Sequence, residues 1–253
     1  MQAAAIAFVD QLRADDRVMV MSFDDRLEVL SELTNDRAQL RRSIRETRTG
    51  GGTRLYDAVD FIINKRVKII TGRKAIVLFT DGVDTTSRRA SYESTVRDAD
   101  ELDALIYSVQ YSTFGGGGIV VGNGGGWPFP RRRGGGILNL PFPFPMPLPG
   151  PVPGSGGGGG NGSRGEHDRG TAYLNDLAMK TGARVNRADS LPSIEQSFAL
   201  IAEELRRQYS IGYYPKKLAR AGERRQIKVR MREPNLVVRA RDSYIFGRMK
   251  DEG

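Results

Sequence analysis

The sequence predicts an α/β fold with a doubly wound, mostly parallel sheet, and three observations carry this prediction. Ala75–Phe79 is an uninterrupted apolar run, the pattern of a parallel strand that is covered on both faces. Apolar strand-like runs alternate along the chain with segments of helical periodicity, which is the order of elements in a doubly wound sheet. The run ends in Thr80-Asp81-Gly82, which places a carboxylate at the edge where such sheets bind ligands.

The first elements along the chain follow from their apolar spacing. Residues Ala3–Leu12 have the periodicity of an amphipathic helix. Val18–Phe23 is apolar throughout and predicts a buried strand, whereas Leu27–Leu33 alternates and predicts a half-exposed strand at the sheet edge. The turn Asp24-Asp25 joins these two strands as a hairpin.

Further helices and strands continue the α/β order. Asp36 is a predicted cap for a short helix, and an apolar-periodic helix containing Leu55 and Ile63 follows a glycine-rich loop. After the Ala75–Phe79 strand we expect a helix near Tyr92–Leu102 and a strand over Ala104–Tyr111. Residues 1–111 are therefore predicted to be the first part of one α/β domain.

Residues 112–166 interrupt this order. They hold 20 of the 31 glycines and 9 of the 12 prolines, and predict a disordered insertion because they offer too little apolar surface to offset the entropy of ordering. Prolines alternate with large apolar residues over 141–149. Such a run favours polyproline geometry, and docking of this run on an aromatic-lined groove is the alternative to an insertion without a partner.

The rest of the chain is predicted to complete the domain over 167–207 and to add an antiparallel β extension over 208–253. The first part contains a helix over Thr171–Met179 that ends at Gly182, a short strand, and a long helix capped by Ser190. The extension contains three strand-like runs. They are Gln208–Tyr214, Arg225–Met231 and Leu236–Ile245.

Composition narrows the possible functions. The net charge of +9 allows binding to nucleic acid or an anionic surface, but no nucleic-acid recognition motif accompanies it, and the basic residues look spread along the chain. The absence of cysteine excludes disulfides, thiolate metal sites and a cysteine nucleophile. No apolar run reaches the roughly 18 residues of a membrane span, and we recognise no signal peptide.

Two loops carry the candidate site. Gly50-Gly51-Gly52-Thr53 precedes a predicted helix, and Asp81 follows the apolar strand. A threonine hydroxyl and a carboxylate are oxygen ligands of the kind that Mg²⁺ prefers. Taken singly, Thr53 is also compatible with a helix cap, and Asp81 with a turn stabilised by its own side chain.

These segments resemble the von Willebrand factor type A domain, in particular bacterial proteins related to it. The resemblance covers most of the chain outside the insertion. It rests on DRVMVMSF, GGTRLYDAV, KAIVLFTDGVDT and IAEELRRQYSIGYYP, and on RRQIKVRM and LVVRARDSYIF near the C-terminus. In that family, three loops build a metal-ion-dependent adhesion site for Mg²⁺, whose open position is filled by a carboxylate of a protein partner.

The resemblance assigns Thr53 to the second of these loops and Asp81 to the third, where it would hold the metal directly or through water. Asp84 is close in sequence and is a candidate acceptor behind these ligands, with an exposed turn residue as the alternative. The Asp-x-Ser-x-Ser motif of the first loop is absent from the chain. Thr53 and Asp81 therefore form an incomplete metal site, and Mg²⁺ is expected only in the complete family site.

The same resemblance implies that the sheet lacks its first central strand. The sequence opens within the helix that follows this strand in the family, so we expect Met1 to be an internal methionine of a longer protein. The resemblance also implies export of that longer form to the cell envelope or the exterior.

We expect no catalysis. Asp81 after an apolar strand also suits an aspartyl phosphotransferase, but those enzymes need a second acid two residues later, where Val83 stands. His167, the single histidine, lies at the edge of the insertion. The motifs GxSxG, HExxH and the Walker lysine loop are absent.

The predicted function is a non-catalytic, adhesion-type protein-interaction module. Two alternatives stay open. A binder of nucleic acid or an anionic surface would use Arg131–Arg133 and the basic C-terminal strands. A remnant without any ligand would follow from the missing strand.

Overall fold

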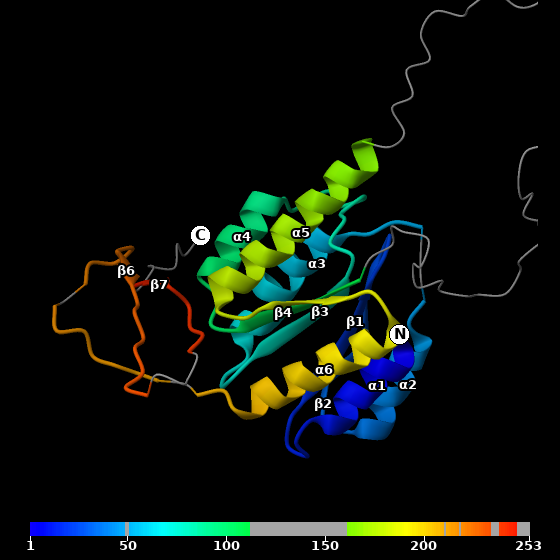
Figure 1. The fold of residues 1–253 in the computed structure, drawn as a ribbon, viewed down its shortest axis with the longest axis horizontal. Helices are drawn as coiled ribbons and strands as arrows, with labels where there is room; N and C mark the ends of the chain where they lie inside the picture. Colours follow the sequence, from blue (N-terminus) through cyan, green and yellow to red (C-terminus); the bar gives the residue numbers. More distant parts are fainter. Residues whose placement is uncertain (49–50, 112–160, 210, 218, 234–237, 247–253) are drawn as a thin grey trace, which may run out of the picture.

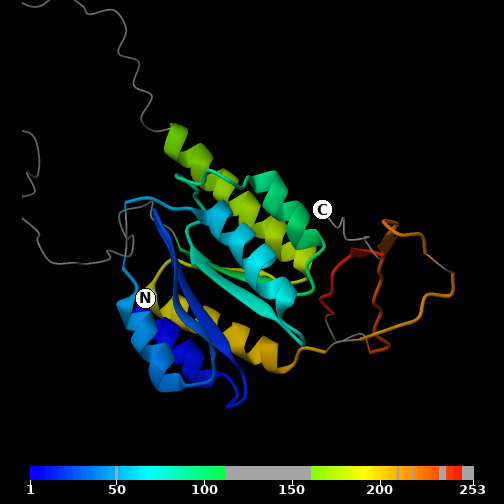
Figure 2. The same cartoon turned by 180° about the vertical axis from the view of Figure 1, so that it is seen from behind.

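The computed structural model describes residues 1–48, 51–111, 161–209, 211–217, 219–233 and 238–246. Within these ranges, strands lie between two layers of helices, which confirms the predicted α/β class (Figure 1). The helices are α1 (Gln2–Gln11), α2 (Arg37–Glu46), α3 (Leu55–Phe61), α4 (Tyr92–Asp100), α5 (Asn161–Thr181) and α6 (Leu191–Arg206). Helices α3, α4 and α5 form one layer, and α1, α2 and α6 form the other (Figure 1, Figure 2).

The parallel part of the sheet has the strand order β3-β4-β5. Strand β3 spans Ala75–Thr80, β4 spans Leu105–Tyr111 and β5 spans Val185–Ala188. All three run in the same direction, with Ile76 opposite Ile106 and Ser108 opposite Val185. Their carboxyl ends therefore meet at one edge of the sheet. Asp81, the predicted site residue, directly follows β3 at this edge.

The predicted helix caps at Asp36 and Ser190 are confirmed. One carboxylate oxygen of Asp36 accepts hydrogen bonds from the backbone N–H groups of Ala38 and Gln39, at 2.8 and 3.1 Å. The Ser190 hydroxyl accepts one from the backbone of Ser193 at 3.3 Å. Beyond its α-helical part, α3 continues through a π-helical turn (Ile62–Arg66) and a 3₁₀ turn (Val67–Ile69). Among the described residues, no helix combines the length and the apolar character that a membrane crossing requires.

The first two strands form a hairpin of their own. Strand β1 (Val18–Phe23) pairs antiparallel with β2 (Leu27–Thr34), as predicted. No strand pairing joins β1 to β3 in the described part of the chain. Every residue of β1 is only half-buried, so the prediction of a buried strand is wrong. The physical reason is that β1 is paired along one edge alone, which leaves its apolar side chains without a neighbour on the other side.

Each helical layer buries its own hydrophobic core against the sheet. One core lies under α3, α4 and α5, and includes Ile106 and Leu177, which are fully buried. The other lies under α1, α2 and α6, and includes Val109 and Ile201, also fully buried. Because neighbouring residues of β4 point to opposite faces, this one strand supplies both cores. The run predicted to be covered on both faces, Ala75–Phe79 in β3, is buried on one face only: Ile76 and Leu78 are buried, whereas Val77 and Phe79 are half-buried.

Helix α5 differs from its predicted extent. It begins at Asn161 rather than at Thr171, so residues 161–166 are helical and not part of a disordered segment. The remainder of the predicted insertion, including Arg131–Arg133, lies outside the described residues. The prediction failed because glycine disfavours helices, so the glycine-rich residues 161–166 gave no helical signal. The Arg169 guanidinium lies 5.8 Å from the centre of the Tyr92 ring on α4.

The C-terminal β extension is smaller than predicted. It consists of β6 (Arg224–Gln226) paired antiparallel with β7 (Ser243–Ile245), in a sheet separate from the main one. The expected strand over Gln208–Tyr214 is absent from the described part of that segment, and the runs around β6 and β7 are strands only in part. Their apolar side chains find little to pack against, since Val229 and Met231 are 42% and 49% exposed.

Candidate functional site

The predicted site lies at the carboxyl edge of the parallel strands, in two segments that we call the loop edge: residues 51–57 and 81–90. Backbone hydrogen bonds join the two segments. The Thr53 N–H donates to the Thr85 hydroxyl oxygen at 2.8 Å, and the Thr53 carbonyl accepts from the N–H groups of Thr85 and Thr86 at 2.9 and 3.1 Å. The structure thus places Thr53 beside the loop that Asp81 begins.

The close contact of these segments explains a glycine. A Cβ atom on Gly52 would lie 2.8 Å from the Thr86 methyl carbon, which is closer than real Cβ contacts allow. The alternative role of Thr53 as a helix cap is not observed. The residue at the cap position of α3 is Arg54 rather than Thr53, and no side chain forms a capping hydrogen bond there.

Asp81 itself is half-buried and stabilises a tight turn. Its Oδ1 atom accepts a hydrogen bond from the Val83 N–H at 3.0 Å, as in the alternative interpretation of this residue. Its negative charge also reaches the end of β4. Burial first, and then the charge of Asp81, raise the pKa of Tyr111 to about 12.

Gln110 positions the Asp81 loop and was not identified from the sequence. This buried side chain on β4 donates from Nε2 to the Asp81 carbonyl at 3.0 Å and to the Thr171 hydroxyl at 2.8 Å. Thr171 donates in turn to the His167 carbonyl at 3.0 Å. One amide group therefore ties the loop after β3 to helix α5. His167 is helical and half-buried rather than a loop residue.

A second link between this loop and α5 is a direct backbone contact. Gly82 has φ +90°, in the left-handed region that favours glycine. A Cβ atom at Gly82 would lie 2.8 Å from the carbonyl carbon and oxygen of Gly170, and one at Gly170 would lie 2.5 Å from the Gly82 oxygen. Only a pair of glycines lets the helix and the loop approach this closely.

Asp84 stabilises the start of α3. Its Oδ1 atom accepts hydrogen bonds from the Tyr56 N–H at 3.1 Å and from the Ser87 hydroxyl at 2.5 Å, and Oδ2 accepts one from the Ser87 N–H at 3.2 Å. The negative charge at the first turn of α3 is also favourable for the helix dipole. The carboxylate is thus engaged by protein groups on both oxygens, and a role behind metal ligands stays a prediction.

Asp57 is the acid at this edge that the sequence did not reveal. It is buried in the first turn of α3, and accepts hydrogen bonds from three consecutive backbone N–H groups, those of Arg88, Arg89 and Ala90, at 3.1, 2.9 and 2.9 Å. Burial alone raises the pKa of this carboxyl, but the three N–H groups outweigh burial and hold the pKa below its ordinary value.

The residues of the loop edge do not by themselves fit a Mg²⁺ ion. Mg²⁺ requires near-octahedral oxygen coordination. Of the three carboxylates at this edge, Asp57 and Asp84 accept hydrogen bonds from protein groups on both of their oxygens. The described residues contain no group of three or more histidine, cysteine or acidic side chains suited to a metal. Thr53 and Asp81 would thus supply one hydroxyl and one carboxylate, which is too few.

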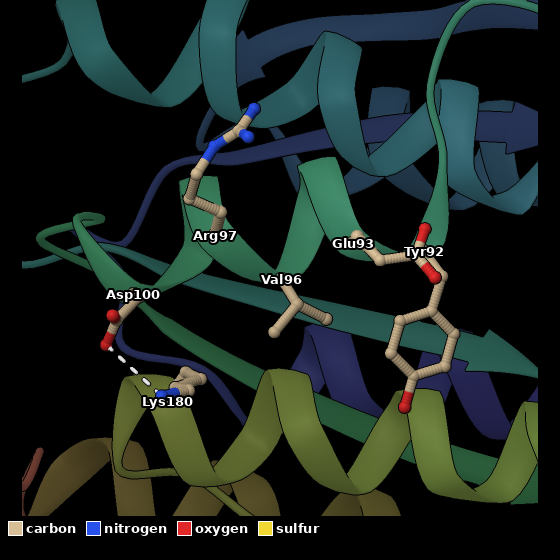
Figure 3. Close-up of a pocket in the computed structure, with 6 residues that line it drawn as sticks. All are labelled: Tyr92, Glu93, Val96, Arg97, Asp100 and Lys180. Atoms are coloured by element: carbon tan, nitrogen blue, oxygen red, sulfur yellow. Dashed lines mark ion pairs between the residues drawn. The ribbon is translucent and has the colours of Figure 1, made fainter.

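A shallow groove lies between α4 and α5, away from the loop edge. Its volume is about 380 Å³. Figure 3 shows Tyr92 and Val96 pointing from α4 towards α5, whereas Arg97 points away. The buried Asp100 closes one end of the groove by an ion pair with Lys180 at 3.8 Å. Tyr92 donates to Asp176 on α5 at 2.8 Å, so the polar groups of this groove fasten two helices together.

Comparison with known proteins gives a family match for the N-terminal part of the chain. The family model described as "von Willebrand factor type A domain" matches residues 1–83, which include Thr53 and Asp81. A comparison with curated protein sequences finds no match.

Several solved structures are similar to this chain. A von Willebrand factor type A protein from Catenulispora acidiphila is 11% identical, with a TM-score of 0.51, over 79% of this chain and 36% of that one. The chain thus spans little more than a third of that relative. BatB from Bacteroides thetaiotaomicron is 14% identical, with a TM-score of 0.47, over 81% and 85% of the two chains.

An aerotolerance-related membrane protein from Bacteroides fragilis NCTC 9343 is 12% identical, with a TM-score of 0.48, over 80% of this chain and 86% of that one. At identities this low, a structural likeness shows the fold alone. The Catenulispora structure therefore supports the α/β fold of this chain and not a particular ligand.

The glycine contact generates a prediction with a matched control. Gly72 also has φ +90°, but a Cβ atom there meets nothing within 4 Å. Gly72→Ala should therefore cost only the backbone penalty, about 1–2 kcal/mol. Gly82→Ala should cost about 1–3 kcal/mol more, because the methyl group forces the loop away from α5. Urea unfolding of both variants measures the difference, and equal losses would show that the contact with Gly170 contributes nothing.

The hydrogen bonds of Asp57 generate a prediction about pH. Because its pKa is lowered in the folded protein, its contribution to stability is complete above the unfolded pKa of about 4 and is lost as the pH falls through the folded pKa. Asp57→Asn should lower the free energy of unfolding by about 1–3 kcal/mol at pH 7 and by less at pH 3. The exposed Asp25→Asn serves as the control. A deficit of Asp57→Asn that does not shrink in acid would contradict this assignment.

Proposed function

We propose that this chain, whose residues 1–83 match the model of the von Willebrand factor type A domain, is a non-catalytic module of that family that binds another protein through its loop edge. Domains of this family are typically protein-interaction modules. The observation that carries the proposal is the construction of the loop edge. Two segments far apart in sequence are locked together by the hydrogen bonds of Thr53, and form one rigid surface at the end of the sheet.

Two exposed arginines of this surface favour a partner with exposed carboxylates. The side chains of Arg88 and Arg89 are exposed. Their backbone N–H groups are fixed by Asp57, so both arginines start from a defined position. Arginine presents a planar group that binds a carboxylate through two hydrogen bonds. A carboxylate ligand also agrees with the family resemblance found in the sequence.

We propose that the partner is recognised without a resident Mg²⁺ ion in this chain, because the donor set described above is too small. If other oxygen ligands complete the site, Thr53 and Asp81 are the residues of this chain that would hold the ion, and the ion would supply a positive charge for a partner carboxylate. We also propose that the protein is exported to the cell envelope or beyond, and this part of the proposal rests on the family resemblance alone.

The metal part of this proposal predicts a negative result for the chain alone. About 10 mM MgCl₂ should shift the melting temperature of the wild type no more than it shifts that of Thr53→Ala or Asp81→Asn. A ligand stabilises a protein only to the extent that it binds the folded state. Thermal melts with and without the salt measure this. A rise in the wild type that both variants lack would show that these two residues hold Mg²⁺.

The contact surface can be tested by charge reversal. The wild-type chain is immobilised and used to capture proteins from extracts of the source organism. The double variant Arg88→Glu and Arg89→Glu, immobilised in the same way, should lose most of this capture. The control Arg42→Glu and Arg45→Glu makes the same charge change at exposed positions of α2, and should retain binding. Carbodiimide blocking of carboxylates in the extract should abolish capture. Equal capture by wild type and loop-edge variant would refute the assignment of this surface.

A further inference from the structure

The positive charge of the protein is concentrated in residues 208–246, which we call the C-terminal arm. This segment holds ten lysines and arginines and three acidic residues, so it contributes seven of the nine net positive charges. The expectation that basic residues are spread along the chain is therefore wrong. Figure 1 shows the arm, with β6 and β7, projecting from the body of the protein on the side opposite the N-terminus.

Some of these cations hold the arm in place. Arg224 pairs with the buried Asp100 of α4, and Arg239 pairs with Glu204 of α6 at 3.1 Å. Arg241 donates to the Leu102 carbonyl. The backbone of the arm also passes so close to Gly182 that a Cβ atom there would lie 2.8 Å from the Arg241 nitrogen. The base of the arm is thus fixed to the body by charge and by packing.

The other cations of the arm face solvent. Six exposed lysines and arginines form no ion pair with any residue that the structure describes. They are Lys216, Lys217, Arg220, Lys228, Arg230 and Arg232. These six cations therefore have no ion-pair partner in the described part of the protein. Their positive charge attracts an anionic partner over a long range.

Large apolar side chains are exposed on the same segments. Eight of the twelve most exposed large apolar residues among the described positions lie in the arm. They are Tyr209, Ile211, Tyr213, Tyr214, Val229, Met231, Val238 and Phe246. Tyr209 and Tyr214 are 86% and 100% exposed. An exposed apolar surface of this kind, next to unpaired cations, indicates a binding site.

The mixture of side chains distinguishes between anionic partners. Tyrosines can stack on nucleic-acid bases, and cations bind phosphates in nucleic acids and lipids alike. The aliphatic side chains of Ile211, Val229 and Met231 gain nothing from a phosphate backbone. They do gain by leaving water for the boundary between lipid headgroups and acyl chains, where tyrosine is also favoured.

We propose that the C-terminal arm binds the surface of an anionic lipid bilayer. The six free cations contact headgroup phosphates, and the exposed tyrosines and aliphatic side chains enter the interface. The segment 228–232 shows both parts, since Lys228, Arg230 and Arg232 alternate with Val229 and Met231. This inference rests on the arm alone and is independent of the protein-binding role of the loop edge.

The test uses the full chain and sedimentation with two kinds of vesicle, pure phosphatidylcholine and phosphatidylcholine with about 30% phosphatidylglycerol. Binding is expected only to the anionic vesicles, and should weaken as salt screens the charges. Each basic residue near such a surface contributes about fivefold to binding, so the triple variant Lys228→Glu, Arg230→Glu and Arg232→Glu should bind at least about 100-fold more weakly. The control Arg42→Glu, Arg45→Glu and Lys65→Glu makes the same charge change on the body and should lose much less.

A second triple variant tests the apolar part and keeps the charge. Tyr214→Ser, Val229→Ser and Met231→Ser should also reduce vesicle binding, because insertion is lost. These positions are exposed, and circular dichroism should show unchanged folding. The proposal is overturned if this variant binds anionic vesicles like the wild type. It is equally overturned if the wild type binds a short oligothymidylate but neither vesicle, which would make the arm a nucleic-acid surface.

Discussion

The backbones of Gly82 and Gly170 meet where the loop after β3 passes under α5, and the arrangement of the loop edge depends on this contact. Because neither residue has a side chain, the helix lies directly on the turn. Gln110 reaches both sides of the junction, through the Asp81 carbonyl and the Thr171 hydroxyl. The same helix then delivers Leu177 to the hydrophobic core, so the position of Asp81 and the packing of the core are set together.

The acids at the loop edge divide into those that build it and one that remains at its surface. Asp57 and Asp84 accept hydrogen bonds from backbone N–H groups of the opposite segment, and a carboxylate used this way stabilises a loop rather than a metal ion. Asp81 shares one oxygen with its own turn. This division explains why the edge is held by many hydrogen bonds and yet poor in metal ligands, and it is the reason why we propose recognition through Arg88 and Arg89.

The charge distribution separates the protein into two regions for which we propose different roles. The α/β body carries little net charge, whereas the C-terminal arm is strongly basic and exposes aromatic and aliphatic side chains. The loop edge and the arm do not share residues, so a protein partner and an anionic bilayer need not compete. A module held at a bilayer by its arm would present the loop edge to partners close to that surface.

The sequence by itself determined the fold class, the order of elements and the helix caps, since apolar periodicity and the polar groups at helix starts act over a few residues. It also placed Thr53 and Asp81 at the ends of their elements. Only the tertiary structure decided that Gln110, Gly170 and Asp57 assemble the loop edge, because their partners are distant in sequence. Tertiary structure also decided the short length of β6 and β7. Alternation of apolar and polar residues predicts a strand, but pairing with a neighbouring strand and burial determine how much of it forms.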